Sequence, residues 1–398
     1  MEDIRNLVTE LREKGYYPTI RTITSGIDPE ITIDGRRLLM FCSNDYLALA
    51  NFPKVKSAAI AAIENYGVST CASRLISGNT DLHEDLENEL ADFLGTESAI
   101  VFTTGYMANS GVIPALVNGI NMFRLLKKET IIISEELNHA SIIDGCKIAK
   151  NRVEVYKHSD TNDLEKKLKK FRSKRKIVIT DAVFSMDGDY APIKSIVGLC
   201  RSYNALLMVD EAHSIGVLGK TGRGVTEFFD LEPNEDIPVL MGTLSKAIGS
   251  IGGYIAGSKL LIDYLRVTAR SYIFTASPLP PASTAAAIQA IREIKNNPKL
   301  VTSLNKNADY LRTGLKQHGF DTLNSSTPII PIVIGDEVKA IKFSDRLFNE
   351  GILAPCVRWP AVPKGKARIR CVVMATHTKE HLDTFIEKCK KIKLNFGI

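Results

Sequence analysis

The stretch Leu206-Leu-Met-Val-Asp-Glu-Ala-His213 sets the fold of this chain. Its apolar residues run without a break to Asp210, which is typical of a strand buried on both faces of a parallel sheet. Such sheets bind ligands beyond the carboxyl ends of their strands. We therefore expect Asp210 and His213 to lie at such an end, beside a bound molecule. Taken singly, Asp210 could also be a helix cap or turn residue, and His213 a structural side chain.

The next apolar run leads into Met241-Gly-Thr-Leu-Ser-Lys-Ala-Ile-Gly-Ser-Ile-Gly-Gly253, where Lys246 stands among small and hydroxyl residues. The glycines let the backbone approach a flat ligand closely. Thr243 and Ser245 can donate hydrogen bonds to a phosphate. This combination suits a lysine held as a Schiff base with pyridoxal phosphate (PLP). The alternative is a surface lysine in a glycine-rich turn.

The order of these groups along the chain favours the PLP interpretation. Asp210 can pair with a protonated pyridine nitrogen and keep the ring an electron sink. His213 would then lie within reach of the ring's phenolic oxygen. A carboxylate, an imidazole and a lysine in this order are hard to explain as unrelated structural residues.

Strands and helices alternate over most of the chain. Continuous apolar strands between helices predict an α/β fold, with a mostly parallel seven-stranded sheet covered by helices. The expected strands span residues 98–102, 130–134, 152–156, 176–180, 206–209, 238–241 and 253–257. After about residue 280 the pattern changes to that of a small C-terminal α+β domain.

Three units are expected from this pattern. Residues 1–45 would form an N-terminal segment, with a helix over 3–14 that stops at Gly15 and a hairpin that turns at Asp34-Gly35. A large domain would span residues 46–285 and the small domain residues 286–398.

Composition excludes several classes of protein. The chain has 398 residues, of which 44% are hydrophobic and 24% charged, with a net charge of +6, as in ordinary globular proteins. The basic run 166–176 is interpreted as a solvated face, so no nucleic-acid partner is expected. Seven cysteines without a C-x-x-C pair favour reduced thiols in the cytoplasm and no metal site. We expect neither a signal peptide nor a membrane span.

Further candidate residues follow other expected strands. The helix start in Phe102-Thr-Thr-Gly-Tyr-Met-Ala-Asn109 could hold a phosphate, although many strand-to-helix turns look like this. His139, after strand 130–134, could lie flat on a cofactor ring, or be a capping or surface histidine. Ser185, after strand 176–180, could bind a ring substituent.

Two arginines on the expected strand 367–374 form a separate candidate. Arg368 and Arg370 face the same way because side chains alternate along a strand. An arginine there could clamp a substrate carboxylate. The alternative is a pair of solvent-facing arginines on an edge strand.

Several motifs give the chain a resemblance, nearly end to end, to the α-oxoamine synthase family of fold-type I PLP enzymes. The motifs are Ser43-Asn-Asp-Tyr-Leu47, Ser73-Arg-Leu-Ile-Ser-Gly-Asn79, Asn138-His-Ala-Ser-Ile-Ile-Asp-Gly145, Phe184-Ser-Met-Asp-Gly188, Val209-Asp-Glu-Ala-His213, Gly242-Thr-Leu-Ser-Lys246, Val362-Pro-Lys-Gly-Lys-Ala-Arg-Ile-Arg370 and Met374-Ala-Thr-His-Thr378.

The resemblance implies a role for each matching position. Lys246 would hold the cofactor and exchange the substrate's Cα proton, Asp210 would pair with the pyridine nitrogen, and His139 would stack on the ring. His213 and Ser185 would bind the phenolic oxygen. The remaining implied positions are Gly105, Tyr106 and Thr243 at the phosphate, Thr275 there from the other subunit of a homodimer, Asn44 and Arg370 at the amino-acid carboxylate, and Arg21 at the acyl-substrate entrance.

The resemblance also implies an activity, the decarboxylative condensation of a small L-amino acid with an acyl thioester of CoA or acyl-carrier protein. Segments 100–102, 138–146 and 242–249 are most similar to family members of biotin synthesis, which use L-alanine and a pimeloyl thioester. Ala361 and the segment 33–41 are more similar to serine palmitoyltransferases. That activity, and that of 2-amino-3-oxobutyrate CoA ligases, therefore stay open.

Two alternatives belong to other classes. A PLP aminotransferase would share Lys246 and Asp210, but His139 stands where aminotransferases usually stack an aromatic ring. An inactive PLP-binding scaffold subunit is disfavoured by the presence of Lys246.

Overall fold

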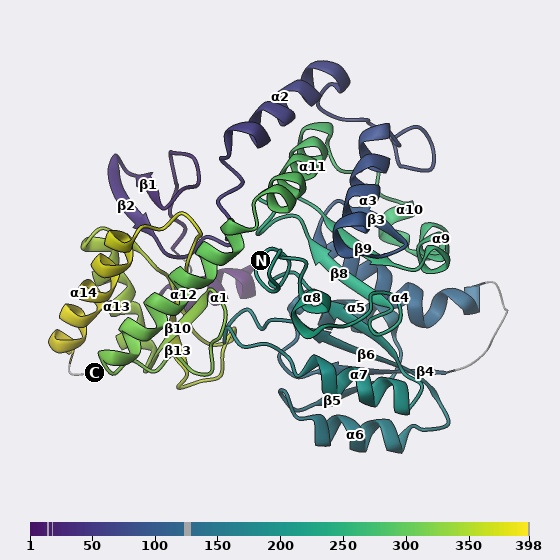
Figure 1. The fold of residues 1–398 in the computed structure, drawn as a ribbon. Coiled ribbons are helices and arrows are strands. Elements are labelled where there is room, and N and C mark those ends of the chain that lie inside the picture. The colour runs from purple at the N-terminus through teal and green to yellow at the C-terminus, as the bar shows by residue number, and fades with distance from the viewer. Residues whose placement is uncertain (14–15, 18, 123–128, 397–398) are drawn as a thin grey trace.

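The computed structural model describes residues 1–13, 16–17, 19–122 and 129–396, and Figure 1 shows their arrangement. At the centre lies a sheet in which, over these residues, seven strands run in the order β3-β9-β8-β7-β6-β4-β5. β9 is antiparallel to both its neighbours, and the other pairs are parallel. The predicted mostly parallel, seven-stranded sheet is confirmed. The strands are β3 (Ser98–Phe102), β4 (Thr130–Glu135), β5 (Val153–Tyr156), β6 (Arg175–Asp181), β7 (Leu206–Asp210), β8 (Val239–Thr243) and β9 (Gly253–Gly257).

Successive side chains of this sheet enter two different cores, which explains why its strands are apolar throughout. On β4, Ile131 and Ile133 join one core and Ile132 joins the other. Helices α3, α6, α7 and α11 contribute to the first core, and α4, α5, α9 and α10 to the second. The helices of this region are α2 (Pro53–Tyr66), α3 (Asp81–Leu94), α4 (Gly105–Met122), α5 (Ala140–Ala149), α6 (Thr161–Lys170), α7 (Ile193–Ser202), α8 (Val225–Phe229), α9 (Lys259–Thr268), α10 (Arg270–Ile273) and α11 (Pro281–Asn296).

The C-terminal part of the chain builds a second sheet, whose described strands run in the order β10-β13-β12, with antiparallel pairs. β13 is the middle strand, and both Arg368 and Arg370 are buried. This excludes the alternative of solvent-facing arginines on an edge strand. The elements here are α12 (Lys299–Gln317), β10 (Ile329–Gly335), α13 (Glu337–Asn349), β11 (Ile352–Leu353), β12 (Cys356–Val357), β13 (Ala367–Val372) and α14 (Lys379–Phe396).

The N-terminal hairpin joins this C-terminal part rather than the central sheet. β1 (Glu30–Ile33) and β2 (Arg36–Met40) are connected through Asp34 and Gly35, whose φ values of 50° and 71° are those of a two-residue hairpin turn. β2 then pairs in parallel with β11. The backbone N–H of Phe41 donates to the carbonyl of Leu353 at 2.9 Å.

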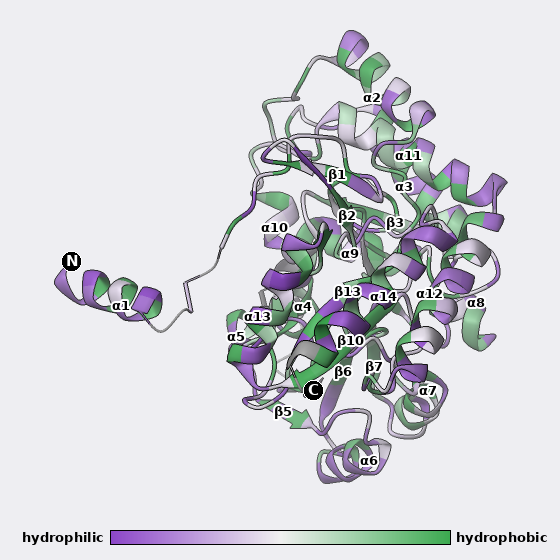
Figure 2. Cartoon of the chain, turned by 90° about the vertical axis from the view of Figure 1, so that its left-hand side faces the viewer, coloured by the Kyte–Doolittle hydropathy of each residue, from purple (hydrophilic) through white to green (hydrophobic). Residues whose placement is uncertain are grey.

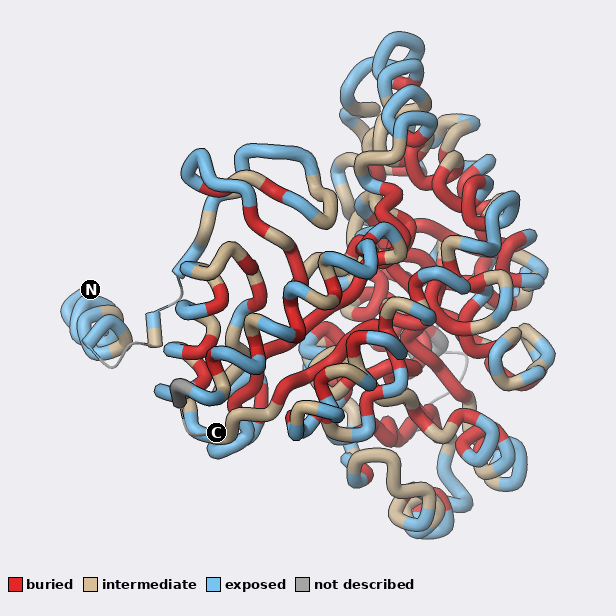
Figure 3. Tube along the Cα trace, turned by 60° about the vertical axis from the view of Figure 1, so that its left-hand side comes forward, coloured by how far each residue is buried: buried red, intermediate tan, exposed pale blue. Residues whose placement is uncertain are grey.

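The first helix, α1 (Glu2–Glu13), stands apart from the rest of the molecule (Figure 2) and contains no buried residue (Figure 3). Its predicted stop at Gly15 lies outside the described residues. The predicted domain boundaries after residues 45 and 285 stay predictions. In the described part of the chain, no helix is both long and apolar enough to cross a membrane.

Candidate active site

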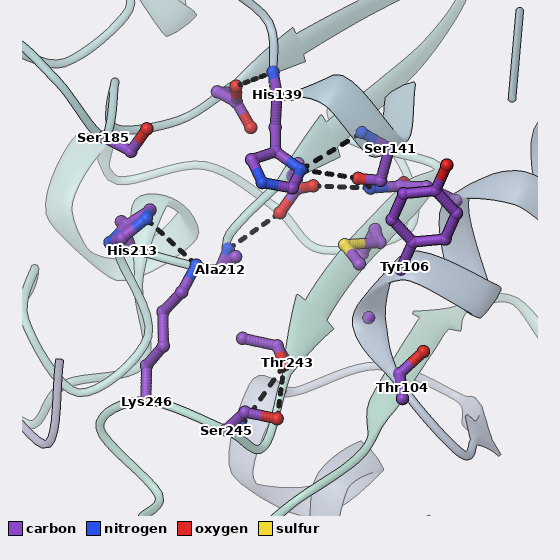
Figure 4. A pocket seen from close by; sticks show the side chains of 15 residues that line it. Thr104, Tyr106, His139, Ser141, Ser185, Ala212, His213, Thr243, Ser245 and Lys246 are labelled. Carbon is purple, nitrogen blue, oxygen red and sulfur yellow. Dashed lines mark hydrogen bonds between the residues drawn. The ribbon is translucent and has the colours of Figure 1, made fainter. Parts of the chain in front are cut away.

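The carboxyl ends of the neighbouring strands β4, β6, β7 and β8 open into a pocket of about 240 Å³ (Figure 4). This is the edge of the sheet at which the sequence predicted a site. Among the side chains and backbone that line the pocket are the predicted residues Gly105, Tyr106, His139, Ser185, Asp210, His213, Thr243 and Lys246.

Lys246 follows β8 in the turn of small residues that the sequence singled out. Its Nζ lies 2.9 Å from Nε2 of His213. Burial lowers the pKa of Lys246 to about 8, because the ammonium loses its hydration, although Asp210 and Asp181 oppose the change. A substantial fraction of Lys246 is therefore the neutral amine near pH 8, which is the form that attacks a carbonyl carbon.

His213 is fixed between this amine and Tyr46. The hydroxyl of Tyr46 lies 2.6 Å from Nδ1 of His213, on the side of the ring away from the lysine. Burial lowers the pKa of His213 well below its usual value, and the positive charges of Lys246 and Arg370 lower it further. His213 is therefore a neutral imidazole with both ring nitrogens held.

Asp210 ends β7 and is 3% exposed. Its Oδ2 accepts a hydrogen bond from Nδ2 of Asn109 at 2.8 Å, and its Oδ1 accepts one from the backbone N–H of Ala212 at 2.9 Å. Two donors thus fix the orientation of the carboxylate at the wall of the pocket. A carboxylate held in this way can bind the protonated nitrogen of an aromatic ring.

His139 lies at the end of the loop that connects β4 to α5, and it caps the N-terminus of α5. Its backbone N–H donates to Oδ2 of Asp181 at 2.7 Å, and its Nδ1 lies 2.7 Å from Oγ of Ser141. Burial lowers the pKa of His139, whereas Asp210 opposes this change. The ring is consequently a neutral, immobilised face of the pocket.

Hydroxyl and N–H donors gather at the opposite end of the pocket. α4 begins at Gly105, and the first N–H groups of a helix have no partners within the helix. A Cβ at Gly105 would lie 3.2 Å from Oγ1 of Thr243, so the glycine allows this helix end to approach β8. Thr243 Oγ1 lies 3.3 Å from Oγ of Ser245. A helix N-terminus beside two hydroxyls is a site for an anion such as phosphate.

Tyr106 also lines the pocket, and its hydroxyl donates to Asp144. The hydroxyl of Tyr106 is thus bonded to a residue of α5. The role of Tyr106 at the phosphate stays a prediction.

Arg370 belongs to β13 of the C-terminal sheet, and its side chain reaches Ser185, which lines the pocket. Its Nε donates to the carbonyl of Ser185 at 2.6 Å, and its Nη2 donates to Oδ1 of Asn44 at 3.2 Å. Its positive charge contributes to the lowered pKa values of Lys246 and His213. Arg368 differs, because its guanidinium is paired with Asp187. The predicted pair of Arg370 and Asn44 is thus in contact, and Arg370 is the arginine that affects the lysine.

Four predicted residues, Asn44, Arg370, Arg21 and Thr275, are not among those that line this pocket. Arg370 and Asn44 are linked to it through the bond from Arg370 to Ser185, whereas Arg21 and Thr275 lie elsewhere. Arg21 stacks on Phe348 at 3.5 Å and lies 3.5 Å from Asp345, both on α13. Thr275 donates its hydroxyl to the carbonyl of Ser271 and lines a separate small cleft with Phe102. Their roles at the acyl entrance and at a partner's phosphate stay predictions.

Four side chains that hydrogen-bond to predicted site residues were not singled out from the sequence: Tyr46, Asn109, Ser141 and Asp181. Tyr46, Asn109 and Ser141 lie within segments quoted in the sequence analysis, and Asp181 directly follows the expected strand 176–180. What could not be seen was that α4 and α5 meet, bringing Asn109 against Ser141 at 2.9 Å. A Cβ on Gly145 of α5 would lie 2.9 Å from the carbonyl of Asn109, and this glycine was the available signal.

The polar groups of the pocket fit the functional groups of PLP. Lys246 supplies a neutral amine, Asp210 a carboxylate for the pyridine nitrogen, and the helix start with Thr243 and Ser245 an anion site. His139 offers a neutral ring to stack on the cofactor. The fold and this site define a fold-type I PLP-dependent transferase.

Comparisons with known proteins narrow this class. The model of the family "Aminotransferase class I and II" matches residues 36–388. The 8-amino-7-oxononanoate synthase of Thermosipho melanesiensis is 47% identical, over 98% of this chain and 97% of that protein. The corresponding synthase of Thermoanaerobacter pseudethanolicus is 46% identical, over 100% and 98%.

Solved structures agree on the fold. A serine palmitoyltransferase of S. paucimobilis with a bound PLP–myriocin aldimine has a TM-score of 0.92 at 32% identity, covering 100% of this chain and 98% of that one. An 8-amino-7-oxononanoate synthase of Francisella tularensis has a TM-score of 0.76 at 27% identity, covering 91% and 99%. The chain belongs to the α-oxoamine synthase family of the class I and II aminotransferase fold.

Proposed function

We propose that the chain is an 8-amino-7-oxononanoate synthase, which condenses L-alanine with a pimeloyl thioester, releases carbon dioxide and serves biotin biosynthesis. The observation that carries this proposal is the contact of Arg370 with Asn44 and Ser185 beside Lys246. A guanidinium held near the amine of Lys246 supports binding of the carboxylate of an α-amino acid. Full-length relatives at 44–47% identity with this name support the choice of substrates.

Bound PLP supplies an electron sink for the electron pair left on Cα when a proton or carboxylate departs. Asp210 holds a proton on the pyridine nitrogen, and its own position is fixed by Asn109. Ser185 and His213 would bind the phenolic oxygen, and His139 would stack on the ring. Thr243 and Gly105 hold the phosphate.

The chain's own groups then handle the substrate. Arg370 and Asn44 bind the carboxylate and thereby orient the Cα–H bond. Lys246, whose pKa burial lowers to about 8, takes the Cα proton as the neutral amine. After the new C–C bond forms and the thiol leaves the acyl carbon, the carboxylate departs as carbon dioxide. Lys246 returns a proton to Cα, and its amine then displaces the amino group of the aminoketone, which leaves the site.

The expected setting of the enzyme is a homodimer in the cytoplasm. All seven cysteines are free thiols, which supports a reducing compartment. Exposed apolar side chains near the Thr275 cleft, such as Phe274 at 69% exposure, support a subunit contact there. Thr275 would then complete the partner's phosphate site.

Serine palmitoyltransferase activity is the second candidate, and the loop around Ala361 favours it. A buried acyl carboxylate needs a partner, and alanine offers no hydrogen-bonding side chain. Trp359 of the same loop is 48% exposed, which adds apolar surface. However, Lys364 lies 5.3 Å from the centre of the Trp359 ring, so a cation is available in that loop.

A panel of thioesters decides between the candidates. Pimeloyl, acetyl and palmitoyl thioesters are each combined with L-alanine, glycine and L-serine, and free thiol release is measured. We expect the highest kcat/KM for pimeloyl with L-alanine. The highest value for palmitoyl with L-serine would refute the biotin assignment, and keto-acid formation without thiol release would indicate an aminotransferase.

A further inference from the structure

A chain of hydrogen bonds connects Asp210 to His139. Asn109 Nδ2 lies 2.8 Å from Asp210 Oδ2 and 2.9 Å from Ser141 Oγ. Ser141 Oγ lies 2.7 Å from Nδ1 of His139. The members come from β7, α4 and α5 and from the cap of α5, so three elements must pack correctly to build the chain.

The carboxylate at one end fixes the direction of every bond in this chain. An ionised carboxylate only accepts, so Asn109 must turn its NH₂ group toward Asp210. That group has two hydrogens, and the second is donated to Ser141 Oγ. Since Ser141 Oγ accepts from Asn109, its own proton is available for Nδ1 of His139.

A second donor acts on the same ring nitrogen. The backbone N–H of Ser141 lies 3.2 Å from Nδ1 of His139. A nitrogen that receives two donors carries no proton of its own, so a neutral imidazole must be protonated at Nε2. Burial lowers the pKa of His139, which keeps the ring neutral.

The other nitrogen of the ring faces the pocket. Figure 4 shows Nε2 of His139 on the side away from Ser141, toward Ser185 and His213. Among the residues that the structure describes, Nε2 has no hydrogen-bond partner. It is therefore the position at which His139 can meet a bound molecule.

We propose that Asn109 and Ser141 are positioning residues that hold His139 as the tautomer with its proton on Nε2, so that the ring donates a hydrogen bond to an oxygen of the bound substrate. Asp210 then has two tasks, because it also orients the Asn109 amide and thereby sets the direction of the bonds that leave the proton of His139 on Nε2. The inference rests on the proposed function in one respect, because the oxygen that accepts the hydrogen bond from Nε2 of His139 belongs to the substrate.

The holoenzyme labelled with ¹⁵N-histidine tests the tautomer directly by nitrogen NMR. The signals of His139 are identified by their loss in His139→Gln. We expect Nδ1 to be of the unprotonated type and Nε2 of the protonated type. A protonated Nδ1 in the wild-type enzyme would overturn the inference whatever the variants do.

Variants of Ser141 test the cause. Ser141→Ala removes the hydroxyl donor, and we expect a second population of His139 protonated on Nδ1, together with a threefold to tenfold loss of kcat/KM for the amino acid, about the effect of one neutral hydrogen bond. Ser141→Thr retains a hydroxyl and should restore the wild-type signals. Ser202→Ala on α7, whose hydroxyl bonds Gly198 within its own helix, is the matched control.

Unchanged His139 signals in Ser141→Ala would overturn the role of Ser141. The NMR measurement needs no substrate, so it is separate from the test of function. An enzyme inactive with every thioester but protonated on Nε2 would refute the proposed function and leave the tautomer assignment standing.

Discussion

Nζ of Lys246 and Nε2 of His213 lie 2.9 Å apart, although each group is a cation when fully protonated. Two cations at this distance in a buried site would repel each other strongly. Burial lowers the pKa of both groups, so His213 is neutral beside the lysine and the two cations do not coexist. The lysine thereby becomes a nucleophile, and His213 remains a neutral hydrogen-bonding partner.

The first prediction concerns where the cofactor is attached. Borohydride treatment of the yellow holoenzyme should fix a pyridoxyl group on Lys246, which a peptide map identifies. Lys246→Ala should still bind PLP without a covalent bond, because the Asp210 and Thr243 contacts remain, but should not turn over. Lys259→Ala, with an exposed side chain, is the control and should behave as wild type. A pyridoxyl group on another lysine would contradict the site.

The second prediction concerns pH. Because burial lowers the pKa of Lys246 to about 8, the neutral amine increases as pH rises through 8 rather than through the usual 10.5. The rate constant for covalent reconstitution of the apoenzyme with PLP should therefore rise with pH and level off above about 9. Stopped-flow absorbance measures it. A rise that continues to pH 10 would mean that the lysine is not desolvated.

Asp210→Asn provides the third prediction. Asparagine keeps the shape and the contact with Ala212, but it cannot hold a proton on the pyridine nitrogen. Exchange of the substrate's Cα proton for deuterium, followed by NMR with L-alanine and no thioester, should slow about 100-fold or more, as for loss of a preorganised electrostatic contact. Near-normal exchange would remove Asp210 from its assigned role.

The fourth prediction separates the two arginines of β13. Arg370→Lys keeps the charge but loses the planar fork, so the amino-acid Kd in a spectral titration should rise about tenfold or more. Arg368→Lys alters the pair with Asp187 and should leave this Kd near wild type while lowering Tm. The reverse result would assign the carboxylate to Arg368.

Sequence was a good guide wherever a short segment carried its own chemistry. Asp210, His213 and Lys246 follow strands whose apolar runs are unmistakable, and the structure brings all three into one pocket. The burial of Arg368 and Arg370 could not be predicted in the same way. It depends on the position of β13 between β10 and β12, and no local sequence pattern encodes these strand pairings.

Contacts between distant segments were the other limit. The link from Asn109 to Ser141 exists only because α4 packs against α5. Likewise, the resemblance implies a role for Arg21 at the acyl-substrate entrance, yet its guanidinium lies over Phe348 of α13, more than 300 residues further along the chain. The residue types indicated the chemistry of the site, whereas tertiary packing determined which side chains meet there.

The pairing of β2 with β11 has a consequence for synthesis on the ribosome. β2 emerges early, but its partner strand follows only after roughly 310 further residues, about 15 to 60 s later at ordinary elongation rates. Throughout that interval one edge of the hairpin is open to pairing with other chains. Arg36, exposed on β2 shortly before the residues Leu39 and Met40 that pair with β11, places a positive charge near this open edge, and such a charge discourages association of nascent chains before the C-terminal strand is made.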